Sequence, residues 1–498
     1  MPIGREVSNP CPASAKKRAA MDSEVRSPRP RLYEQLANQL RAAIEAGTLL
    51  PGDRLPSVRR LCQQHHVSVA TAVHALGCLE SAGLLVARPK SGHYVRAQRR
   101  PSEPRPVRLS PQVSTASVSS IIRSVYDQSS SASGIDFGYA QTASGLLPGK
   151  RLGRMLIAVT RAAKYGGAEY EPAAGHLPLR QQIARRSLDW GCALSPDDLL
   201  ITNGATSAIQ LCLSAVARRG DTVAIESPTF LGILQLLEIL ALKALEIPCD
   251  PRYGMNLRSL EEGLKKHRVA AVISVTNFSN PLGSCMPDAN KEALVAMLAR
   301  RGVPLIEDDA NGDLPYGPTR PKVAKAFDRH GMVILCGSFS KTLAAGYRVG
   351  WLAAGRYKER IELLKLAQNE RAATLTQRAV AAFLEGGGYD RHLRTLRHRL
   401  ASSMQRASAL VAEHFPPGTR MTRPKGGMVL WLELPRRVSA LKLYQLAAAE
   451  EIRIAPGPLF SARQELNHFI RLNTGVEWND RVAAALVRLG QLARELAG

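Results

Sequence analysis

The most constraining part of this 498-residue chain is residues 338–351, SFSKTLAAGYRVGW. Lys341 follows an apolar run at 332–336, which predicts a buried strand, and Arg348 comes seven residues after it. A lysine that forms a Schiff base with pyridoxal phosphate needs such a setting, because its amine must lie at a strand end with hydroxyls and a guanidinium near the phosphate. A bare Ser-x-x-Lys pattern is usually a polar surface loop, so this prediction depends on the rest of the chain.

Two motifs upstream of this lysine suit other parts of the same cofactor. Residues 199–207, LLITNGATS, predict a strand, a glycine-containing turn and the start of a helix. The free N–H groups and the dipole at a helix N-terminus suit a phosphate, although Thr206 and Ser207 could equally be helix caps. Phe230 follows a predicted strand at 222–225, where its ring could stack on a flat ring or belong to the core.

Polar residues mark three further predicted strands. The strand at 272–276 leads into an Asn-rich loop, and the strand at 303–306 ends in Glu-Asp-Asp at 307–309. Carboxylates at the end of a buried strand are costly unless they are paired, and a protonated pyridine nitrogen would pair one of them. The alternative is a solvated loop. Arg471 lies inside an apolar strand near the C-terminus, where a carboxylate partner makes sense.

In order and approximate spacing, these motifs resemble the fold-type I pyridoxal-phosphate enzymes of the aspartate aminotransferase class, over about residues 135–498. The resemblance implies that Lys341 and Asp308 are the catalytic pair, with Asp308 on the pyridine nitrogen, and that Arg471 binds an α-carboxylate. The other implied cofactor contacts are Asn280 to the ring hydroxyl, Phe230 on the ring face, Ala205, Thr206, Ser338 and Arg348 to the phosphate, and Tyr170 to the phosphate of a partner subunit.

The chain departs from this class at one position. After the Asp308 position the class usually carries a tyrosine that bonds the ring oxygen of the cofactor, and this chain has Asn311 at the aligned place. An amide can still hydrogen-bond that oxygen, but it is shorter than a phenol and has no acidic proton. We therefore expect cofactor binding to tolerate Asn311 better than efficient transamination does.

The first hundred residues predict a separate domain. Apolar residues at helical spacing and serine caps predict three helices, and two short apolar runs around a Pro-Lys-Ser-Gly turn predict a hairpin. Three helices followed by a hairpin form a winged helix-turn-helix. The predicted helices are residues 32–44, 58–64 and 69–82, and the hairpin strands are 84–88 and 93–96.

The blocks PGDRLPSVRRL at 51–61 and SGHYV at 91–95 resemble the GntR class of bacterial DNA-binding domains, over residues 30–97. The resemblance implies that the helix after Ser68 enters the major groove and that the hairpin lies along the DNA backbone. The class often has a basic residue after this serine, whereas Val69 follows here, which puts base readout from that point in doubt. The predicted DNA contacts are Arg59, Arg60, Ser68, Thr71, His74, Lys90 and Gly92.

Composition agrees with a nucleic-acid partner. The net charge of +25 favours a polyanion. No apolar run approaches 18 residues and the start is polar, so we expect no membrane span and a cytoplasmic protein. The eight cysteines have no CxxC pair, which indicates reduced thiols and no metal site.

The expected organisation is a disordered basic tail (1–28), the winged-helix DNA-binding domain (29–97), a flexible linker (98–134) and an α/β fold-type I transferase-like domain (135–498).

A GntR-like winged helix fused to an aminotransferase-like domain resembles the MocR group of bacterial transcription regulators. The resemblance implies a homodimer that binds double-stranded DNA and senses pyridoxal phosphate, an amine or an amino-acid effector. Two alternatives remain open at this point. One is an active aminotransferase with weak or vestigial turnover, and the other is a DNA-binding protein whose pocket no longer binds the cofactor.

Overall fold

Two units divide the chain between Arg96 and Ala97, here called the N-terminal unit and the large unit. The structure, a computed structural model, describes residues 31–45, 48–50, 52–88, 91–96, 101–106, 112–116, 118–119, 134–368 and 371–498. The tail predicted at 1–28, and Lys90 in the predicted hairpin turn, lie outside these described residues.

The N-terminal unit is the predicted winged helix-turn-helix. Ser57 and Ser68 each accept a hydrogen bond from a backbone N–H in the first turn of the helix that follows, so both helices begin where the sequence predicts. The helices and the antiparallel hairpin enclose a leucine-rich core. The elements are α1 (Leu32–Glu45), α2 (Val58–His65), α3 (Val69–Ser81), β1 (Leu85–Arg88) and β2 (Gly92–Val95).

A nine-stranded sheet, counted over the described residues, forms the centre of the large unit. Five neighbouring strands run parallel and are almost wholly apolar and buried, as is typical of a parallel sheet in an α/β fold. Along the sheet the strands are β3 (Val113–Thr115), β7 (Lys243–Asp250), β6 (Thr222–Ser227), β9 (Val269–Ser274), β10 (Leu305–Asp308), β11 (Val333–Ser338), β12 (Gly350–Ala353) and β5 (Leu199–Thr202), and β8 (Gly254–Met255) pairs with β7.

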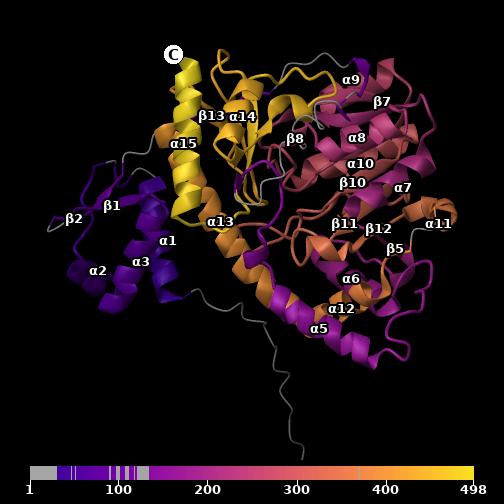
Figure 1. Cartoon of the computed structure of the whole chain (residues 1–498), viewed down its shortest axis with the longest axis horizontal. Coiled ribbons are helices and arrows are strands. Elements are labelled where there is room, and N and C mark those ends of the chain that lie inside the picture. The colour runs from indigo at the N-terminus through magenta and orange to yellow at the C-terminus, as the bar shows by residue number, and fades with distance from the viewer. Residues whose placement is uncertain are drawn as a thin grey trace, which may run out of the picture. The chain divides into compact units, whose positions relative to one another are not determined.

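Helices surround this sheet, and Figure 1 shows α7 to α10 beside its strands. The long helix α13 runs from the C-terminal layer towards α5 and α12, so it links the two layers of the large unit (Figure 1). None of the helices that the structure describes has the length and apolar character needed to cross a membrane. The helices are α5 (Gly149–Ala162), α6 (Leu177–Ser187), α7 (Ala205–Val216), α8 (Leu231–Ile239), α9 (Leu257–Lys266), α10 (Asp288–Arg301), α11 (Lys358–Ala367), α12 (Thr374–Glu385) and α13 (Gly388–His414).

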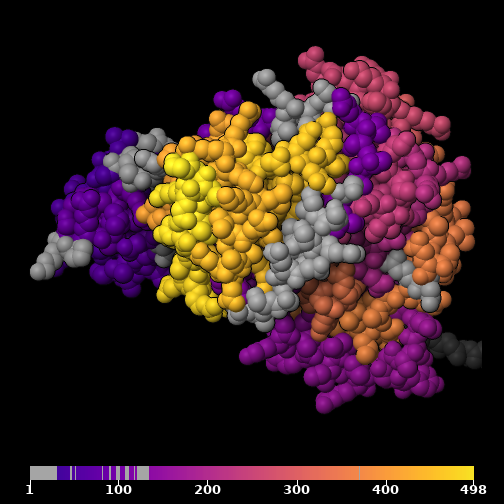
Figure 2. All heavy atoms as spheres, turned by 45° about the horizontal axis from the view of Figure 1, so that its top comes forward, coloured from indigo at the N-terminus to yellow at the C-terminus, as the bar shows by residue number. Residues whose placement is uncertain are grey.

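A smaller four-stranded sheet and two helices make the C-terminal layer, whose yellow and orange atoms form one continuous surface in Figure 2. Arg471 lies at the centre of its strand β17, opposite Trp431 of β14 and Ala455 of β16. The elements are β13 (Arg420–Met421), β14 (Val429–Glu433), β16 (Ala455–Pro456), β17 (Phe469–Asn473), α14 (Ala440–Ala449) and α15 (Asp480–Ala497), with β15 (Ile452–Arg453) paired to β4 (Ile135–Asp136) nearby.

Two strands differ from their predicted limits in a way that affects the site. The strand predicted at 303–306 is β10, which continues through Asp308 because Glu307 and Asp308 still pair with Leu335 and Cys336 of β11. The strand predicted at 272–276 is β9, which begins earlier and ends at Ser274. The carboxylates are therefore part of the sheet rather than of a loop.

The described parts of the predicted flexible linker are bound to the large unit. Residues 113–115 form β3, an antiparallel edge strand on β7, and Val118 is fully buried. Glu238 of α8 accepts hydrogen bonds from the backbone N–H groups of Val118 and Ser119 and from the Ser119 hydroxyl. In these residues the segment is an ordered strap that covers a sheet edge, which protects that edge from pairing with another chain.

A second anchor precedes this strand and touches both layers of the large unit. Glu103 pairs with Arg252, which follows β7, and Ser102 accepts a hydrogen bond from Met421 N of β13 at 3.0 Å. The Arg105 N–H donates to Glu433 of β14 at 3.3 Å. Residues 101–106 thus bridge the large sheet and the C-terminal layer, directly after the N-terminal unit in sequence.

Candidate cofactor pocket and DNA-binding surface

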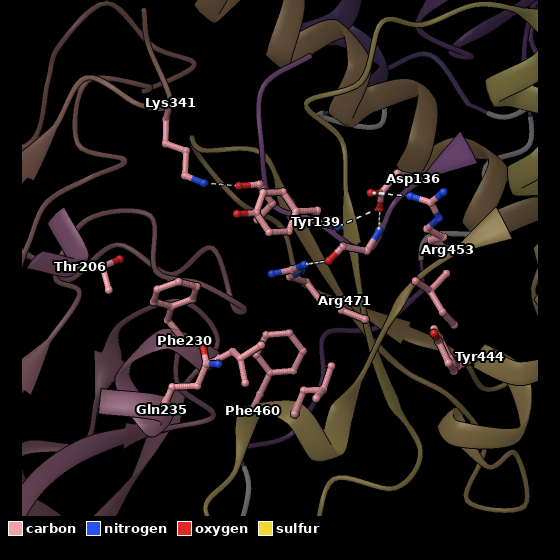
Figure 3. Close-up of a pocket in the computed structure, with 17 residues that line it drawn as sticks. Asp136, Tyr139, Thr206, Phe230, Gln235, Lys341, Tyr444, Arg453, Phe460 and Arg471 are labelled. Atoms are coloured by element: carbon pink, nitrogen blue, oxygen red, sulfur yellow. Dashed lines mark hydrogen bonds and ion pairs between the residues drawn. The ribbon is translucent and has the colours of Figure 1, made fainter. Parts of the chain in front are cut away.

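Four of the predicted cofactor and carboxylate-binding residues, Thr206, Phe230, Lys341 and Arg471, line a cavity of about 390 Å³ in the large unit. Lys341 enters it from the loop after β11, Phe230 from the end of β6 and Arg471 from β17 (Figure 3). The lining residues are Asp136, Gly138, Tyr139, Ala140, Thr206, Phe230, Leu231, Gly232, Gln235, Lys341, Tyr444, Arg453, Ile454, Ala455, Leu459, Phe460 and Arg471.

Lys341 has the properties of a nucleophilic amine. Its backbone carbonyl accepts a hydrogen bond from the Thr142 hydroxyl at 2.7 Å, and its Nζ donates to the Ala140 carbonyl. Burial and the positive charges of Arg471 and Arg348 lower the pKa of Lys341 to about 8, and Asp308 offsets part of this effect. Near neutral pH a useful fraction of the amine is therefore uncharged and able to attack a carbonyl carbon.

Of the three adjacent carboxylates at the end of β10, two have structural partners. Glu307 accepts hydrogen bonds from the Thr276 hydroxyl at 2.5 Å and from the Ala324 and Lys325 N–H groups at 2.6 and 2.9 Å. Asp309 forms an ion pair with Arg320 and accepts from Asn277 Nδ2 at 2.9 Å. Both side chains are buried, and these contacts offset the cost of removing their charges from water.

Asp308 is different, because its hydrogen bond within the described residues comes from one backbone group, Ala310 N, at 3.0 Å. Burial raises the pKa of Asp308 to about 6, and the charge of Asp309 adds to this effect. A buried carboxylate with so little compensation suits a cationic partner from outside the protein. A protonated pyridine nitrogen is such a partner, so this observation fits pyridoxal phosphate.

Asn280 and Arg471 meet although 191 residues separate them. Arg471 Nη1 donates to Asn280 Oδ1 at 3.1 Å, and its Nη2 donates to the Gly138 carbonyl. The guanidinium also lies 5.2 Å from the ring centre of Phe460. Asn280 therefore fixes the orientation of this cavity-lining arginine, to which a carboxylate could bind in bidentate fashion.

The predicted phosphate residues form a second cluster beside Lys341. Arg348 Nη2 donates to the Asn203 carbonyl at 2.8 Å, and the Ser338 hydroxyl accepts from Ser340 N at 3.0 Å. Gly204 precedes α7 with a φ of +103°, and a Cβ there would lie 2.6 Å from Arg348 Nη2. Glycine is required at this turn, and it leaves the first amides of α7, from Ala205 and Thr206, without a side-chain cap. Exposed amides, hydroxyls and a guanidinium fit a phosphate.

Several predicted cofactor residues do not line this cavity: besides Asp308, Asn280, Ala205, Ser338 and Arg348, described above, these are Tyr170 and Asn311. Tyr170 is 78% exposed, with the Arg371 guanidinium 4.9 Å from its ring centre, so its proposed contact with a partner subunit remains a prediction. Asn311 donates its side-chain amide to the Phe278 carbonyl at 3.0 Å. Its proposed role at the ring oxygen also remains a prediction.

The predicted DNA-binding residues lie on α2, α3 and the hairpin of the N-terminal unit. Arg59 and Arg60 are exposed in the first turn of α2, where they suit phosphate contacts. On α3, the Thr71 hydroxyl is 2.8 Å from the Ser68 hydroxyl, and the His74 ring packs 4.1 Å from the ring of Tyr33. Gly92 has a φ of +111° at the start of β2, a conformation that favours glycine in the hairpin turn.

Sequence reasoning missed two large apolar residues that α3 exposes. The helix, VATAVHALGCLES, has no lysine or arginine, and Val69 and Val73 are 61% and 53% exposed one helical turn apart. In the major groove, apolar side chains contact the methyl group of thymine. Exposed β-branched residues at i and i+4 of a DNA-reading helix were the signal that could have identified them.

The cavity also contains polar residues that sequence reasoning missed. Asp136, Tyr444 and Arg453 line its far end, away from Lys341 (Figure 3). The register of β4 and β15 places Asp136 beside Arg453, but these strands have two residues each, so no periodic pattern in the sequence marks them.

Comparisons with known proteins agree with this geometry. The family model for aminotransferase class I and II matches residues 143–486, and the model for bacterial regulatory proteins of the gntR family matches residues 32–95. An uncharacterized HTH-type transcriptional regulator of Escherichia coli, YdcR, is 39% identical over 93% of this chain and 99% of its own length. The chain belongs to the MocR-type transcription regulators. A second E. coli HTH-type regulator, YjiR, is 35% identical to this MocR-type chain over 92% of it and 98% of its own length.

Solved structures match the large unit of this MocR-type regulator. The α-aminoadipate aminotransferase LysN of Thermus thermophilus is 27% identical with a TM-score of 0.69, over 76% of this chain and 95% of its own. A multiple substrate aminotransferase of Thermococcus profundus, 24% identical, gives a TM-score of 0.71 over 76% of this chain and 96% of its own. The fold-type I architecture expected from the sequence is therefore confirmed.

Asp308→Asn should stabilise the cofactor-free protein above pH 6 while weakening its binding of pyridoxal phosphate. The folded-state pKa of about 6 is above the ordinary value of 3.8, so wild-type stability falls as the pH rises between these values and stays lower above them. The expected gain in unfolding free energy at pH 8 is at most about 3 kcal/mol, and it should vanish near pH 3.5. Urea unfolding at both pH values measures it. An equal gain in unfolding free energy at both pH values would contradict the raised pKa of Asp308.

Val73→Ser should remove a preference for thymine over uracil in bound DNA. Loss of one methyl contact costs about 0.8 kcal/mol, or roughly fourfold in affinity. The measurement compares operator duplexes, selected from random DNA, with duplexes in which uracil replaces thymine. Leu32→Ser, at an exposed position on α1, is the control, and it should keep the wild-type preference for thymine over uracil. Equal binding of both duplexes by the wild-type protein would exclude apolar readout from α3.

Proposed function

We propose that this MocR-type regulator holds pyridoxal phosphate on Lys341 and senses an amine or amino-acid effector there, as a homodimer bound to double-stranded DNA in the cytoplasm. The observation that carries the proposal is Asp308, a buried carboxylate with one backbone hydrogen bond, next to a lysine whose pKa is lowered to about 8. When bound, pyridoxal phosphate supplies an aldehyde that condenses with primary amines.

Residues in and near the cavity have separate roles in this proposal. Lys341 supplies the amine and Phe230 an aromatic face inside the cavity. Asp308, a buried neighbour of Lys341 outside the cavity lining, supplies the negative charge behind the ring. Arg348 and the amides at the start of α7 hold a phosphate away from the mouth of the cavity. Arg471, held by Asn280, receives the carboxylate of an amino acid that competes with Lys341 for the cofactor.

The dimer part of the proposal rests on Tyr170. Its exposed hydroxyl has no place in the cavity of its own subunit, which favours a role across a subunit boundary. Fold-type I architecture is compatible with such a dimer, because an isologous interface would bring the same residue to both sites.

In this proposal, residues 101–106, which precede β3, transmit the effect of ligand binding in the cavity to the DNA-binding unit. Residues 101–106 bond both to Arg252 beside the large sheet and to Met421 and Glu433 in the C-terminal layer. An effector that contacts both Lys341 in the large-sheet layer and Arg471 in the C-terminal layer would favour one relative position of these two layers. Since only residues 97–100 separate the strap from Arg96, the change would reach the N-terminal unit.

Purified protein incubated with pyridoxal phosphate should gain an absorbance band at the edge of the visible range, which the bare protein lacks, because the cofactor forms a Schiff base with lysine. Borohydride should trap the cofactor on Lys341. Because the neutral amine is the nucleophile, attachment should be about tenfold faster at pH 9 than at pH 7. Lys341→Ala should lose the band, whereas Lys266→Ala, at an exposed position on α9, should keep it. Wild-type protein without a band or a trapped adduct would refute cofactor sensing.

Replacing Arg59 and Arg60 together by alanine should weaken DNA binding across all sequences. Each lost phosphate contact lowers the slope of log affinity against log salt concentration by about 1, so the expected change is about 2. Fluorescence anisotropy at several salt concentrations measures both quantities. Arg360→Ala, at an exposed arginine of α11, is the control for loss of charge alone. If the double variant binds like wild type, α2 is not at the DNA interface.

A further inference from the structure

The cavity extends beyond Arg471 to a second polar end. Arg453, Asp136 and Tyr444 lie there, on the side away from Lys341 (Figure 3). Ala455 pairs with Arg471 across β16 and β17, and Arg453 precedes Ala455 by two residues. The two arginine backbones are therefore offset by roughly 7 Å along the strand direction. One cavity thus contains two guanidinium groups at separate positions.

Asp136 fixes the second arginine in place. Its Oδ1 accepts hydrogen bonds from Gly138 N at 2.7 Å and Tyr139 N at 2.9 Å, which holds the carboxylate as part of a backbone turn. Its Oδ2 lies 3.7 Å from Arg453 Nη1. A guanidinium has five N–H donors and can hold two carboxylates at once, as Arg320 does with Asp309 and Asp313. Pairing with Asp136 therefore orients Arg453 for a ligand rather than preventing it from binding one.

Tyr444 adds a neutral donor beside Arg453. Its side chain is buried, and the residue lines the same cavity. Burial raises the pKa of Tyr444 and the charge of Arg453 offsets part of that rise, which places the two groups within electrostatic reach of each other. A guanidinium and a hydroxyl together are a common donor set for a carboxylate.

Apolar residues, among them Leu231, Leu459 and Phe460, also line the cavity. Three cationic side chains, Lys341, Arg453 and Arg471, line the cavity against one carboxylate, Asp136, so the field in the cavity favours an anionic ligand. An apolar lining that includes two separate arginines suits a ligand with a short hydrocarbon stem and a negative group at each end.

We infer that the effector is an α-amino acid with a second carboxylate at the end of its side chain, bound between Arg471 and Arg453. The inference rests on the proposed function, because the α-amine must reach the cofactor on Lys341. A basic side chain would be repelled by Arg453. An apolar end would strip water from the Arg453–Asp136 pair and give no hydrogen bond in return.

The test uses the full chain loaded with pyridoxal phosphate, and titration calorimetry measures binding without any turnover. The ligands are L-glutamate and L-2-aminoadipate, with L-glutamine and L-norleucine as uncharged counterparts of similar size. Wild-type protein should bind at least one dicarboxylate ten or more times more tightly than its counterpart. Arg453→Gln should bring this ratio close to one, and Arg453→Lys should restore part of it.

Arg436→Gln is the matched control, since Arg436 is an exposed arginine of the C-terminal layer outside the cavity, and it should keep the wild-type ratio. Circular dichroism checks that each variant is folded. The wild-type comparison needs no variant, so equal affinity for charged and uncharged ligands overturns the inference by itself. A ratio unchanged in folded Arg453→Gln also overturns it.

Failure of the proposed function gives a different result. If the cofactor does not attach to Lys341, cofactor sensing is wrong and the effector inference falls with it. If the cofactor attaches but none of the four amino acids binds, the inference about a dicarboxylic effector is wrong while cofactor binding stands.

Discussion

The large unit depends on how buried carboxylates are neutralised at the end of β10. Two acidic side chains, Glu307 and Asp308, end a strand of the parallel sheet and a third, Asp309, directly follows it; all three are buried, where an unpaired charge would destabilise the fold by several kcal/mol. Glu307 is held by backbone amides of the 324–325 turn and Asp309 by Arg320, so the chain following β10 folds back over the sheet to supply these partners. Asp308 is left with one amide. The fold tolerates this weakly paired side chain because burial raises the pKa of Asp308, which favours the uncharged acid when no cation is bound.

Positive charge in the cavity complements that carboxylate. Lys341 is close enough to Asp308 and Arg471 for both to affect its pKa in opposite directions, which keeps the amine partly neutral. Arg471 and Arg453 give the cavity two positions where an anionic group can bind, and Arg453 is the one farther from Lys341. The same electrostatic balance therefore serves the covalent chemistry of the lysine and the selection of a ligand.

The described residues of the segment that follows the N-terminal unit are bound to the large unit. They contact a sheet edge through β3 and both layers through Ser102, Glu103 and Arg105. A free linker would allow the N-terminal unit to move independently of the cavity. The proposed coupling between ligand and DNA depends on this attachment to both layers.

The sequence by itself determined both folds and indicated which residues could form a cofactor site. Serine caps, apolar periodicity and polar residues at strand ends are local signals, and they located Lys341, Asp308, Arg471 and the helices of the N-terminal unit. Only the tertiary structure decided that, within the described residues, Asp308 accepts one backbone hydrogen bond while its neighbours have more partners, that Asn280 holds Arg471, and that Arg453 shares a cavity with Arg471. These pairings join residues far apart in the chain, and which partner neutralises a charge depends on packing that no local pattern records.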